Sequence, residues 1–291
     1  MGGELQPQDP QRIGPYQLIR LLGSGGMGRV YLGRSASGRL VAVKLIRAEL
    51  AADPGFRARF RREVAVAQKV DGLYTAVVVD ADADGPLPWL ATAYVDGPSL
   101  AKAVESYGPL PAASVRALAA GLTEGLSAIH AAGLVHRDLK PTNVLLADDG
   151  PRVVDFGLAQ AAEANALTQA GTVVGSAGYL SPEQVTGEHV GPPCDVFSLG
   201  AVLTFAATGR LPFGAGNEIA MLYRVIHGLP DLDEVPAEVL DLVRRCLAKD
   251  PGGRPTTADL LAELEDTDLT EGWLPIRGIR RAPGFAPPDP W

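Results

Sequence analysis

The sequence predicts an α+β fold in which a small β-rich part comes first and a larger helical part follows. Up to about residue 95, short apolar runs alternate with turns that contain Gly and Pro, a pattern typical of strands. Beyond residue 98, apolar residues recur at helical spacing over longer segments. An apolar content of 46% in 291 residues is normal for a globular core, in one large domain or two small ones.

Charge argues against a nucleic-acid-binding protein. The net charge is −8 and the pI is about 5.1, whereas a nucleic-acid footprint needs a basic face. Arginines crowd together only at Arg57, Arg59, Arg61 and Arg62. This cluster favours a solvated helix face over an anion site.

The cysteine count and the terminal sequence bear on location. Cys194 and Cys246 are the only cysteines, which suits a reducing compartment and predicts neither a disulfide nor a metal cluster. The N-terminus lacks the basic segment and apolar run of a signal peptide. The longest apolar run, residues 196–207, is too short for a bilayer. We therefore expect a cytoplasmic chain without a membrane segment, tethered only if the protein continues beyond residue 291.

The β-rich part is expected to begin after a disordered leader, residues 1–12, which is polar and has no periodicity. Residues 16–22, 29–34 and 40–44 are predicted strands. Between the first two lie Gly23, Ser24, Gly25, Gly26, Met27 and Gly28. Bare amides of such a loop can approach phosphate. A dinucleotide-binding fold would continue into a helix, so a strand after Gly28 indicates a glycine flap within a hairpin.

Lys44 ends an apolar strand, where an isolated ammonium would be costly to bury, so a partner is expected. Residues 54–70 are predicted to be helical, with Pro54 in the first turn. Glu63 lies on the apolar stripe of this helix and is the natural counter-ion, although a Glu at the edge of the stripe could instead reach solvent. Residues 73–81 and 87–94 are two further predicted strands, and residues 94–98 are the expected hinge.

The helical part is predicted from apolar periodicity and from helix start and stop signals. The expected helices are residues 99–106, 111–132, 193–208, 219–227, 236–247 and 256–265. The helix 193–208 is almost entirely apolar and should run through the core. From residue 266 the chain is rich in Pro and Arg without periodicity, and is expected to be a tail or linker.

One stretch carries the chemistry: residues 136–143, His-Arg-Asp-Leu-Lys-Pro-Thr-Asn, followed after a short strand and a turn by Asp155-Phe156-Gly157. Asp138 is a carboxylate that could accept a proton from a hydroxyl nucleophile. Asn143 and Asp155 could hold magnesium through oxygen atoms. Phosphoryl transfer requires these parts, because it depends on positioning and charge neutralisation.

This stretch resembles the catalytic loop and metal-binding triplet of protein kinases, and the Gly-rich loop with Lys44 fits the same pattern. Over residues 13–265 the chain resembles a bacterial, actinobacterial-type serine/threonine protein kinase domain. The resemblance implies a bilobal protein-kinase-like fold. Its N-lobe would span residues 13–95 and its C-lobe residues 96–265.

The resemblance also implies roles for individual residues. Asp138 would orient and deprotonate the substrate hydroxyl, Lys140 would sit near the transferring phosphate, and Lys44, held by Glu63, would contact the α- and β-phosphates. Asn143 and Asp155 would hold Mg²⁺ or Mn²⁺. The ATP pocket would be lined by Leu22, the residues 23–28 loop, Val30, Ala42, Lys44, Thr92, Tyr94 and Val95, with Thr92 as gatekeeper. His136 is expected to be structural, and Asp195 to accept backbone amides of the catalytic loop.

Residues 158–180, with Ser181-Pro182-Glu183 after them, resemble an activation segment. Glu183 is expected to pair with Arg254. Arg137 beside the catalytic Asp could dock a phosphate, so Thr168 and Thr172 are candidate autophosphorylation sites. Related kinases often carry Thr-Gln-Thr here and this chain has Thr168-Gln169-Ala170, which leaves the two-site pattern open.

The sequence favours a protein kinase that transfers the γ-phosphate of ATP to Ser or Thr on proteins, itself included. Protein substrates and ATP are the expected partners, with a homodimer through the N-lobe or for trans-autophosphorylation as a further one. A pseudokinase scaffold is a second interpretation, although each expected catalytic residue is present. A small-molecule phosphotransferase is a third, against which Arg137 and Ser181-Pro182-Glu183 argue.

Overall fold

The structure, a computed structural model, describes residues 3–156, 177–267 and 273–274. The chain divides into two compact units. Among the described residues, the first contains residues 3–71 and 76–94, and the second contains residues 72–75, 95–156, 177–267 and 273–274. The main boundary falls between Tyr94 and Val95, inside the predicted hinge.

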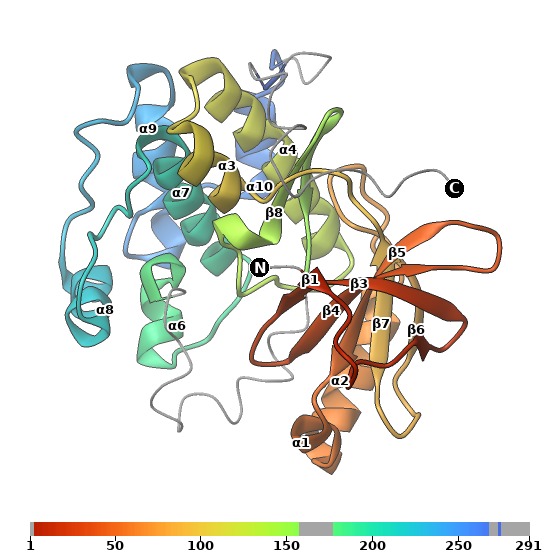
Figure 1. The fold of residues 1–291 in the computed structure, drawn as a ribbon. Helices are drawn as coiled ribbons and strands as arrows, with labels where there is room; N and C mark the ends of the chain where they lie inside the picture. The colour runs from red at the N-terminus through yellow and green to blue at the C-terminus, as the bar shows by residue number, and fades with distance from the viewer. Residues whose placement is uncertain (1–2, 157–176, 268–272, 275–291) are drawn as a thin grey trace. The chain divides into compact units, whose positions relative to one another are not determined.

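The first unit is built on one antiparallel sheet of seven strands (Figure 1). The strands are β1 (Gly3–Glu4), β2 (Arg12–Ile13), β3 (Tyr16–Ser24), β4 (Gly28–Arg34), β5 (Leu40–Ile46), β6 (Val78–Asp82) and β7 (Trp89–Ala93). Their order is β1-β3-β4-β5-β7-β6, and β2 also pairs with β3. The hairpin of β3 and β4 therefore carries the Gly-rich loop between its two strands.

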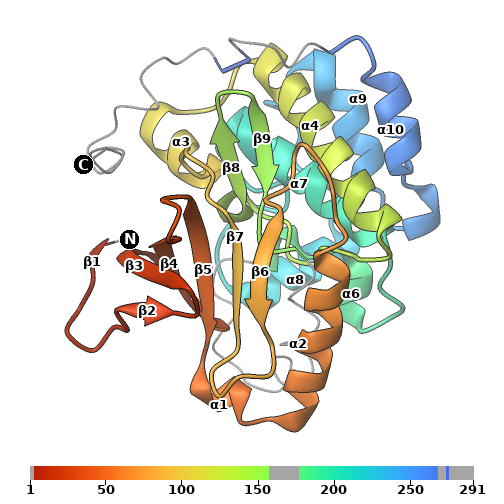
Figure 2. The same cartoon turned by 90° about the vertical axis from the view of Figure 1, so that its right-hand side faces the viewer.

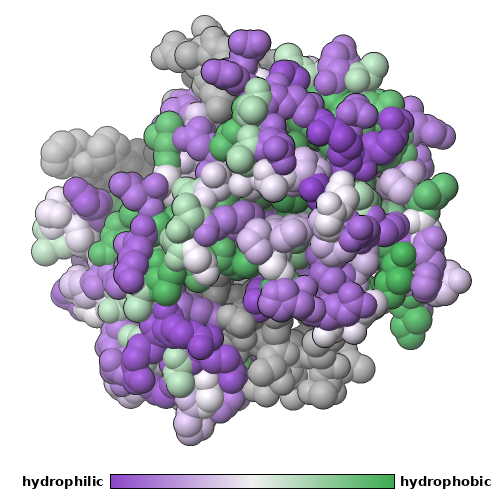
Figure 3. Space-filling model, turned by 180° about the vertical axis from the view of Figure 1, so that it is seen from behind, coloured by the Kyte–Doolittle hydropathy of each residue, from purple (hydrophilic) through white to green (hydrophobic). Residues whose placement is uncertain are grey.

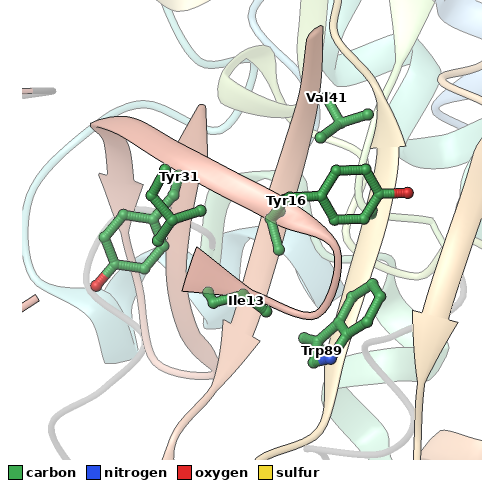
Figure 4. Close-up of a cluster of buried hydrophobic side chains, with 8 residues drawn as sticks. Ile13, Tyr16, Tyr31, Val41 and Trp89 are labelled. Carbon is green, nitrogen blue, oxygen red and sulfur yellow. The ribbon is translucent and has the colours of Figure 1, made fainter. Parts of the chain in front are cut away.

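Alternation along the strands sorts side chains onto the two faces of the sheet. On one face Ile13, Tyr16, Leu18, Tyr31, Val41, Val43, Trp89 and Ala91 form a buried apolar cluster (Figure 4). Tyr16 and Trp89 meet edge to face, with ring centroids 5.8 Å apart. This cluster holds β3, β4, β5 and β7 together and leaves the opposite face to other residues.

The prediction that residues 1–12 form a disordered leader is wrong for residues 3–12. Gly3 and Glu4 pair with Leu21 and Arg20, and Arg12 pairs with Gln17. The order comes from backbone pairing along β3 and from one buried carboxylate, Asp9. Neither contributes an apolar pattern to the sequence.

Two helices accompany the sheet, α1 (Ala48–Ala51) and α2 (Pro54–Ala67), and only α2 is predicted from the sequence. Asp53 caps α2 by accepting the Gly55 amide, and α2 runs beside β6 (Figure 2). The arginine cluster on α2 has a structural use: Arg57 donates to the carbonyls of Gly85 and Pro86. Arg61 is also paired, with Asp84. These contacts hold the turn between β6 and β7.

The predicted strand at residues 73–81 is shorter than expected, because β6 begins only at Val78. Residues 72–75 belong to the second unit. There the carbonyl of Tyr74 accepts the Val153 amide at 2.8 Å, and Thr75 forms an isolated parallel bridge with Val153. The backbone of residues 74 and 75 is thus paired with β9 (Gly150–Val153) rather than with the sheet.

The described part of the second unit is helical apart from the hairpin of β8 (Val144–Ala147) and β9. Its described helices are α3 (Leu100–Tyr107), α4 (Ala112–Ala131), α6 (Pro182–Thr186), α7 (Pro193–Thr208), α8 (Glu218–His227), α9 (Ala237–Cys246) and α10 (Thr257–Glu263). Short 3-10 turns are η1 (Pro141–Asn143), η2 (Ala177–Tyr179) and η3 (Pro251–Gly253). As predicted, α7 is buried on almost every side. It packs beside α4 and α9 (Figure 2).

Within the predicted tail, Trp273 is described and is buried. Its indole Nε1 donates to the Ala147 carbonyl at 3.1 Å, and its own carbonyl accepts the Ser114 hydroxyl at 2.6 Å. The interpretation of the chain from residue 266 as a tail or linker does not anticipate this buried contact. An indole needs both apolar cover and an acceptor, and the end of β8 supplies that acceptor.

Hydrophilic side chains cover most of the surface seen in Figure 3, and the apolar patches between them are scattered. Within the described residues, none of the helices combines the length and apolar character that crossing a membrane requires. Cys194 and Cys246 are free and buried. Burial raises the pKa of the Cys246 thiol to about 12, so this sulfur stays protonated at neutral pH.

Candidate active site

Asp138 is the centre of a small network in the second unit. The ammonium of Lys140 donates to both carboxylate oxygens of Asp138, at 2.9 and 2.8 Å. The side-chain amide of Asn143 donates to the Asp138 carbonyl at 2.8 Å and to its carboxylate at 3.2 Å. These donors hold the carboxylate in one orientation.

The β8–β9 hairpin brings Asn143 and Asp155 close in the structure. Asn143 closes η1 directly before β8, and Val154 follows directly after β9. Val144 pairs with Val153, and the Val154 amide donates to the Asn143 carbonyl at 3.0 Å. The residue after Val154 is Asp155. Strand pairing therefore places an amide and a carboxylate at the same open end of the hairpin.

The loop before Asp138 is anchored on Asp195, which lies in the first turn of α7 and is fully buried. Its carboxylate accepts the backbone amides of His136 and Arg137, each at 2.8 Å, and lies 2.8 Å from His130 Nε2. Burial alone would raise the pKa of Asp195, but the hydrogen bond with His130 and the surrounding donors hold it below its ordinary value. The expectation that Asp195 accepts amides of this loop is confirmed.

Two residues in this region have positive φ although they are not glycines: Arg137 at 65° and Asp155 at 61°. Arg137 is held in this conformation from both sides. Its amide donates to Asp195, and its carbonyl accepts from the Gln184 side chain at 2.8 Å. Such backbone conformations persist only where neighbours enforce them, and they gather at functional sites.

His136 has a structural place, as expected. It is buried, its Nε2 lies 3.1 Å from the Val154 carbonyl, and its Nδ1 accepts the Asp138 amide at 3.3 Å. The imidazole thereby links the loop that carries Asp138 to the strand that leads into Asp155. Both ring nitrogens are used in this way, which argues against a role as general base.

In the first unit, four of the predicted nucleotide-binding residues share one face of the sheet. Val30 pairs with Lys44, and Ala42 pairs with Thr92. Residues directly opposite in an antiparallel ladder lie on the same face, and alternate residues return to it. This face is the one opposite the apolar cluster, because Val41 and Val43 belong to that cluster.

Glu63 is buried on α2, with Phe56, Phe60, Val64 and Ala67 as the other buried residues of the helix. A carboxylate in such a row is costly to bury unless it is paired or hydrogen-bonded. This placement suits a partner for a strand lysine. The pairing of Glu63 with Lys44 stays a prediction.

The Gly-rich loop is tightly closed. Leu22, Gly23 and Ser24 end β3, and the Gly25 amide donates to the Gly28 carbonyl at 2.9 Å. A Cβ at Gly28 would lie 2.0 Å from the Leu45 carbonyl oxygen, so only glycine lets β4 approach β5 there. A Cβ at Gly23, Gly25 or Gly26 would meet no atom within 4 Å.

The loop is also held from β5. Arg47, directly after β5, uses its backbone amide to donate to the Met27 carbonyl at 3.0 Å, and its guanidinium to donate to the Gly25 carbonyl at 2.9 Å. At the other end of the sheet, Tyr94 follows β7 and its amide reaches the Leu40 carbonyl at 3.4 Å. Val95 begins the second unit.

Residues 16–264 match the family model described as "Protein kinase domain". The chain belongs to the protein kinase domain family. It is 54% identical over 271 residues to the probable serine/threonine-protein kinase PkwA of Thermomonospora curvata, with 93% of this chain and 36% of that protein covered. It is 49% identical over 289 residues to the serine/threonine-protein kinase AfsK of Streptomyces coelicolor, with 96% and 36% covered. The chain thus spans about a third of the length of these curated relatives.

A crystal structure of the Mycobacterium tuberculosis PknI kinase domain is also similar. It matches with a TM-score of 0.68 and 26% identity, and the match covers 87% of this chain and 96% of that one. The predicted protein-kinase fold is confirmed, with a β-sheet N-lobe and a larger helical C-lobe. Kinases of this family use ATP and a divalent metal.

The donor set at the open end of the hairpin fits such a metal. The nitrogen of the Asn143 amide donates to Asp138, so its oxygen is the atom that could bind a cation. Asp155 adds a carboxylate, and amide and carboxylate oxygens suit Mg²⁺, which also keeps water and phosphate ligands. Across the described residues, no group of three or more His, Cys, Asp or Glu side chains could hold a metal ion.

Two predicted features lie partly or wholly outside the described residues. Gly157, Thr168 and Thr172 lie outside the described residues, so the end of the Asp-Phe-Gly triplet and both candidate phosphorylation sites stay predictions. The segment after them is described. There Arg254 forms two hydrogen bonds with Glu183, at 2.7 and 2.8 Å, which confirms the expected pair.

Sequence reasoning did not identify the contribution of Gln184. Ser181 caps α6, and the Gln184 side chain accepts the Ser181 amide at 3.1 Å, which completes a capping box. The pattern Ser-Pro-Glu-Gln is a visible signal of this box. The second use of Gln184, as donor to the Arg137 carbonyl, is a long-range contact that no local pattern reveals.

The anchor on Asp195 leads to a testable prediction. Asp195→Asn keeps one acceptor oxygen but turns an amide group towards a buried backbone donor. We expect a loss of about 1–3 kcal/mol in the free energy of unfolding, and a lower kcat, because the catalytic loop loses one of its two amide acceptors. Urea unfolding at neutral pH measures the first effect.

Acidification separates this mechanism from a general packing defect. The pKa of Asp195 is lowered from its ordinary value of 3.8, so its contribution is present above that pH and is lost as the pH falls through the lower folded value. The wild type should therefore lose more stability than Asp195→Asn as the pH falls from about 5 to about 3, the range in which carboxylates titrate. Parallel losses in the two proteins would contradict the anchoring role.

Proposed function

We propose that this chain is the catalytic domain of a serine/threonine protein kinase, which transfers the γ-phosphate of ATP to Ser or Thr hydroxyls of proteins. The observation that carries the proposal is the Asp138 network. One carboxylate is held by Lys140 and Asn143 beside the hairpin end that carries Asp155. The relatives named serine/threonine-protein kinases support the choice of hydroxyl acceptor.

Asp138 is the base of the proposed reaction. Its ionised carboxylate accepts the hydrogen bond of the substrate hydroxyl, orients the oxygen towards the γ-phosphorus, and takes the proton. The hydroxyl oxygen forms its bond to the γ-phosphorus as the bond from that phosphorus to the β–γ bridging oxygen breaks, and ADP leaves. Lys140, which already donates to Asp138, would also neutralise charge on the transferring phosphoryl group. Its position two residues after the Asp is typical of serine/threonine kinases.

The remaining residues would bind the nucleotide. Lys44, positioned by Glu63, would contact the α- and β-phosphates, and the amides of the residues 23–28 loop would cover them. Leu22, Val30, Ala42 and Thr92 would surround the adenine, with Tyr94 and Val95 offering backbone groups. Asn143 and Asp155 would hold the metal, which we propose to be Mg²⁺, with Mn²⁺ as a substitute. When bound, the metal neutralises phosphate charge.

Regulation would come from the enzyme's own activity. We propose autophosphorylation at Thr168, Thr172 or both. One copy would phosphorylate the other in a homodimer, which forms either through the N-lobe or only transiently for this reaction. A new phosphate would pair with Arg137, since one phosphate can form one to three charge-assisted hydrogen bonds. The free cysteines Cys194 and Cys246 suit action in a reducing compartment such as the cytoplasm.

The test is a transfer assay with γ-labelled ATP, the purified chain and a generic protein substrate. Label should be incorporated into both proteins when Mg²⁺ is present, and into neither when EDTA is added before ATP. Acid hydrolysis of the labelled proteins should release phosphoserine and phosphothreonine. Phosphotyrosine alone would contradict the substrate class. Label on a small-molecule hydroxyl but on no protein would favour a small-molecule phosphotransferase, and nucleotide binding without transfer would favour a pseudokinase.

A further inference from the structure

The N-terminal strap, residues 3–13, covers the outer side of β3. Gly3 pairs with Leu21 through β1, Ile13 pairs with Tyr16 through β2, and between these strands the Leu18 amide donates to the Gln11 carbonyl at 2.9 Å. Without the strap, β3 would be an edge strand with unpaired backbone groups. The strap thus spans most of the strand that leads into the Gly-rich loop.

Asp9 fastens the strap to the next strand, β4. One carboxylate oxygen accepts the Tyr31 hydroxyl at 2.8 Å and the Arg29 guanidinium at 2.6 Å. The other oxygen accepts the Gln6 amide at 2.9 Å, within the strap itself. The Asp9 side chain is only 1% exposed, so its carboxylate is sheltered from water, whereas the Arg29 side chain is 48% exposed. The hydrogen bond from the Gln6 amide, and next in size the one from the Tyr31 hydroxyl, lower the pKa of Asp9 and so keep its carboxylate ionised.

Figure 4 shows the Tyr31 hydroxyl directed away from the apolar side chains, while its ring remains among them. A buried hydroxyl at the rim of a core needs a polar partner. Asp9 is that partner. The contact therefore joins the polar strap to the packed core of the N-lobe.

These contacts lie at the base of the Gly-rich loop. Arg29 pairs with Ser24, so it faces the last residue of β3 across the loop. The ladder between β3 and β4 is irregular between Leu21 and Gly23, directly before the loop. The strap holds both strands next to this irregularity: β1 pairs with Leu21 on β3, and Asp9 binds Arg29 on β4.

We propose that Asp9 is a positioning residue for the nucleotide: it ties both arms of the Gly-rich loop, so that the loop is ordered before ATP binds. Binding phosphate through loop amides costs the conformational entropy of ordering them, and a loop with tied arms loses less. This inference rests on the proposed function, since it assumes that the loop covers ATP phosphates. Loss of the tie should raise the KM for ATP more than it lowers kcat.

A matched pair of tyrosine variants tests the proposal. Tyr31→Phe deletes the hydroxyl that donates to Asp9. Tyr16→Phe deletes a hydroxyl that donates to another carboxylate, Asp80, at 3.2 Å, but at the far end of β3. The two changes remove the same group and the same kind of hydrogen bond from one sheet, and differ in their distance from the loop. Asp9→Ala completes the set.

The primary measurement is the affinity for MgAMP-PNP, determined by calorimetry. Asp9→Ala should weaken it about tenfold, the effect of losing about 1.4 kcal/mol, and Tyr31→Phe should weaken it by a smaller factor. Tyr16→Phe should bind as the wild type does. Hydrogen exchange of amides 23–30 without nucleotide should quicken in Asp9→Ala and Tyr31→Phe only. The double variant Asp9→Ala/Tyr31→Phe should be no weaker than Asp9→Ala alone, because both act through one bond.

The inference is overturned if Asp9→Ala and Tyr31→Phe both bind the analogue like the wild type, or if Tyr16→Phe weakens binding equally. Tyr31→Phe decides the question if Asp9→Ala does not fold. Failure of the proposed function looks different. In that case the wild type transfers no phosphate to protein, while the binding and exchange differences among the tyrosine variants persist.

Discussion

Asp138→Ala should lower kcat by about 100- to 10,000-fold, the typical effect of removing a positioned base. The variant removes the carboxylate that Lys140 and Asn143 hold, and with it the acceptor for the substrate proton. Binding of MgATP should change little, because Asp138 acts on the hydroxyl rather than on the nucleotide. Single-turnover transfer of labelled phosphate to protein, with separate nucleotide titration, measures both quantities.

Asp149→Ala is the matched control for this prediction. Asp149 lies in the turn between β8 and β9, is 70% exposed in its side chain, and pairs with Arg152 at 2.6 Å. An exposed pair contributes about 0–1 kcal/mol, so this variant should retain both fold and turnover. Comparable turnover in the Asp138 and Asp149 variants would refute the role of Asp138 as base.

The prediction from sequence succeeds where one local pattern determines an element. The helix predicted at residues 193–208 has the observed bounds of α7. Its apolar run predicts that the helix is buried, and Pro193 and Gly209 mark where it begins and ends. The Gly-rich hairpin is likewise local, since β3 and β4 flank the predicted glycine loop. The residues of the catalytic loop are recognised because their chemistry is concentrated in one stretch.

The errors arise where partners far apart in the sequence decide the structure. Residues 74 and 75 have strand-like sequence, but their backbone pairs with Val153. Residues 3–12 have no apolar pattern, and their order depends on Asp9 reaching Tyr31, 22 positions away. Trp273 is surrounded by a Pro- and Arg-rich sequence and still packs through Ala147, 126 positions away. Each of these contacts is made by a single polar group, which no periodicity reveals.

The second large effect concerns stability rather than catalysis. Arg254 is buried, and its guanidinium donates to both oxygens of Glu183 and also to the Pro193, Ala248 and Lys249 carbonyls. Arg254→Ala should lower the free energy of unfolding by about 3–5 kcal/mol, because it leaves a buried carboxylate and several carbonyls without their donor. Urea denaturation at neutral pH measures the loss.

Arg245→Ala supplies the comparison, since Arg245 also pairs with two acids, Asp241 and Glu263, but at the surface. Its loss should cost about 0–1 kcal/mol. Burial would raise the pKa of Glu183, yet the bonds from Arg254 hold it below 4.5, so the pair stabilises above that pH and weakens as the pH falls. The gap between wild type and Arg254→Ala should therefore narrow on acidification. Equal losses for the two arginines, or a gap that is independent of pH, would show that the buried pair does not hold α6 to the core of the C-lobe.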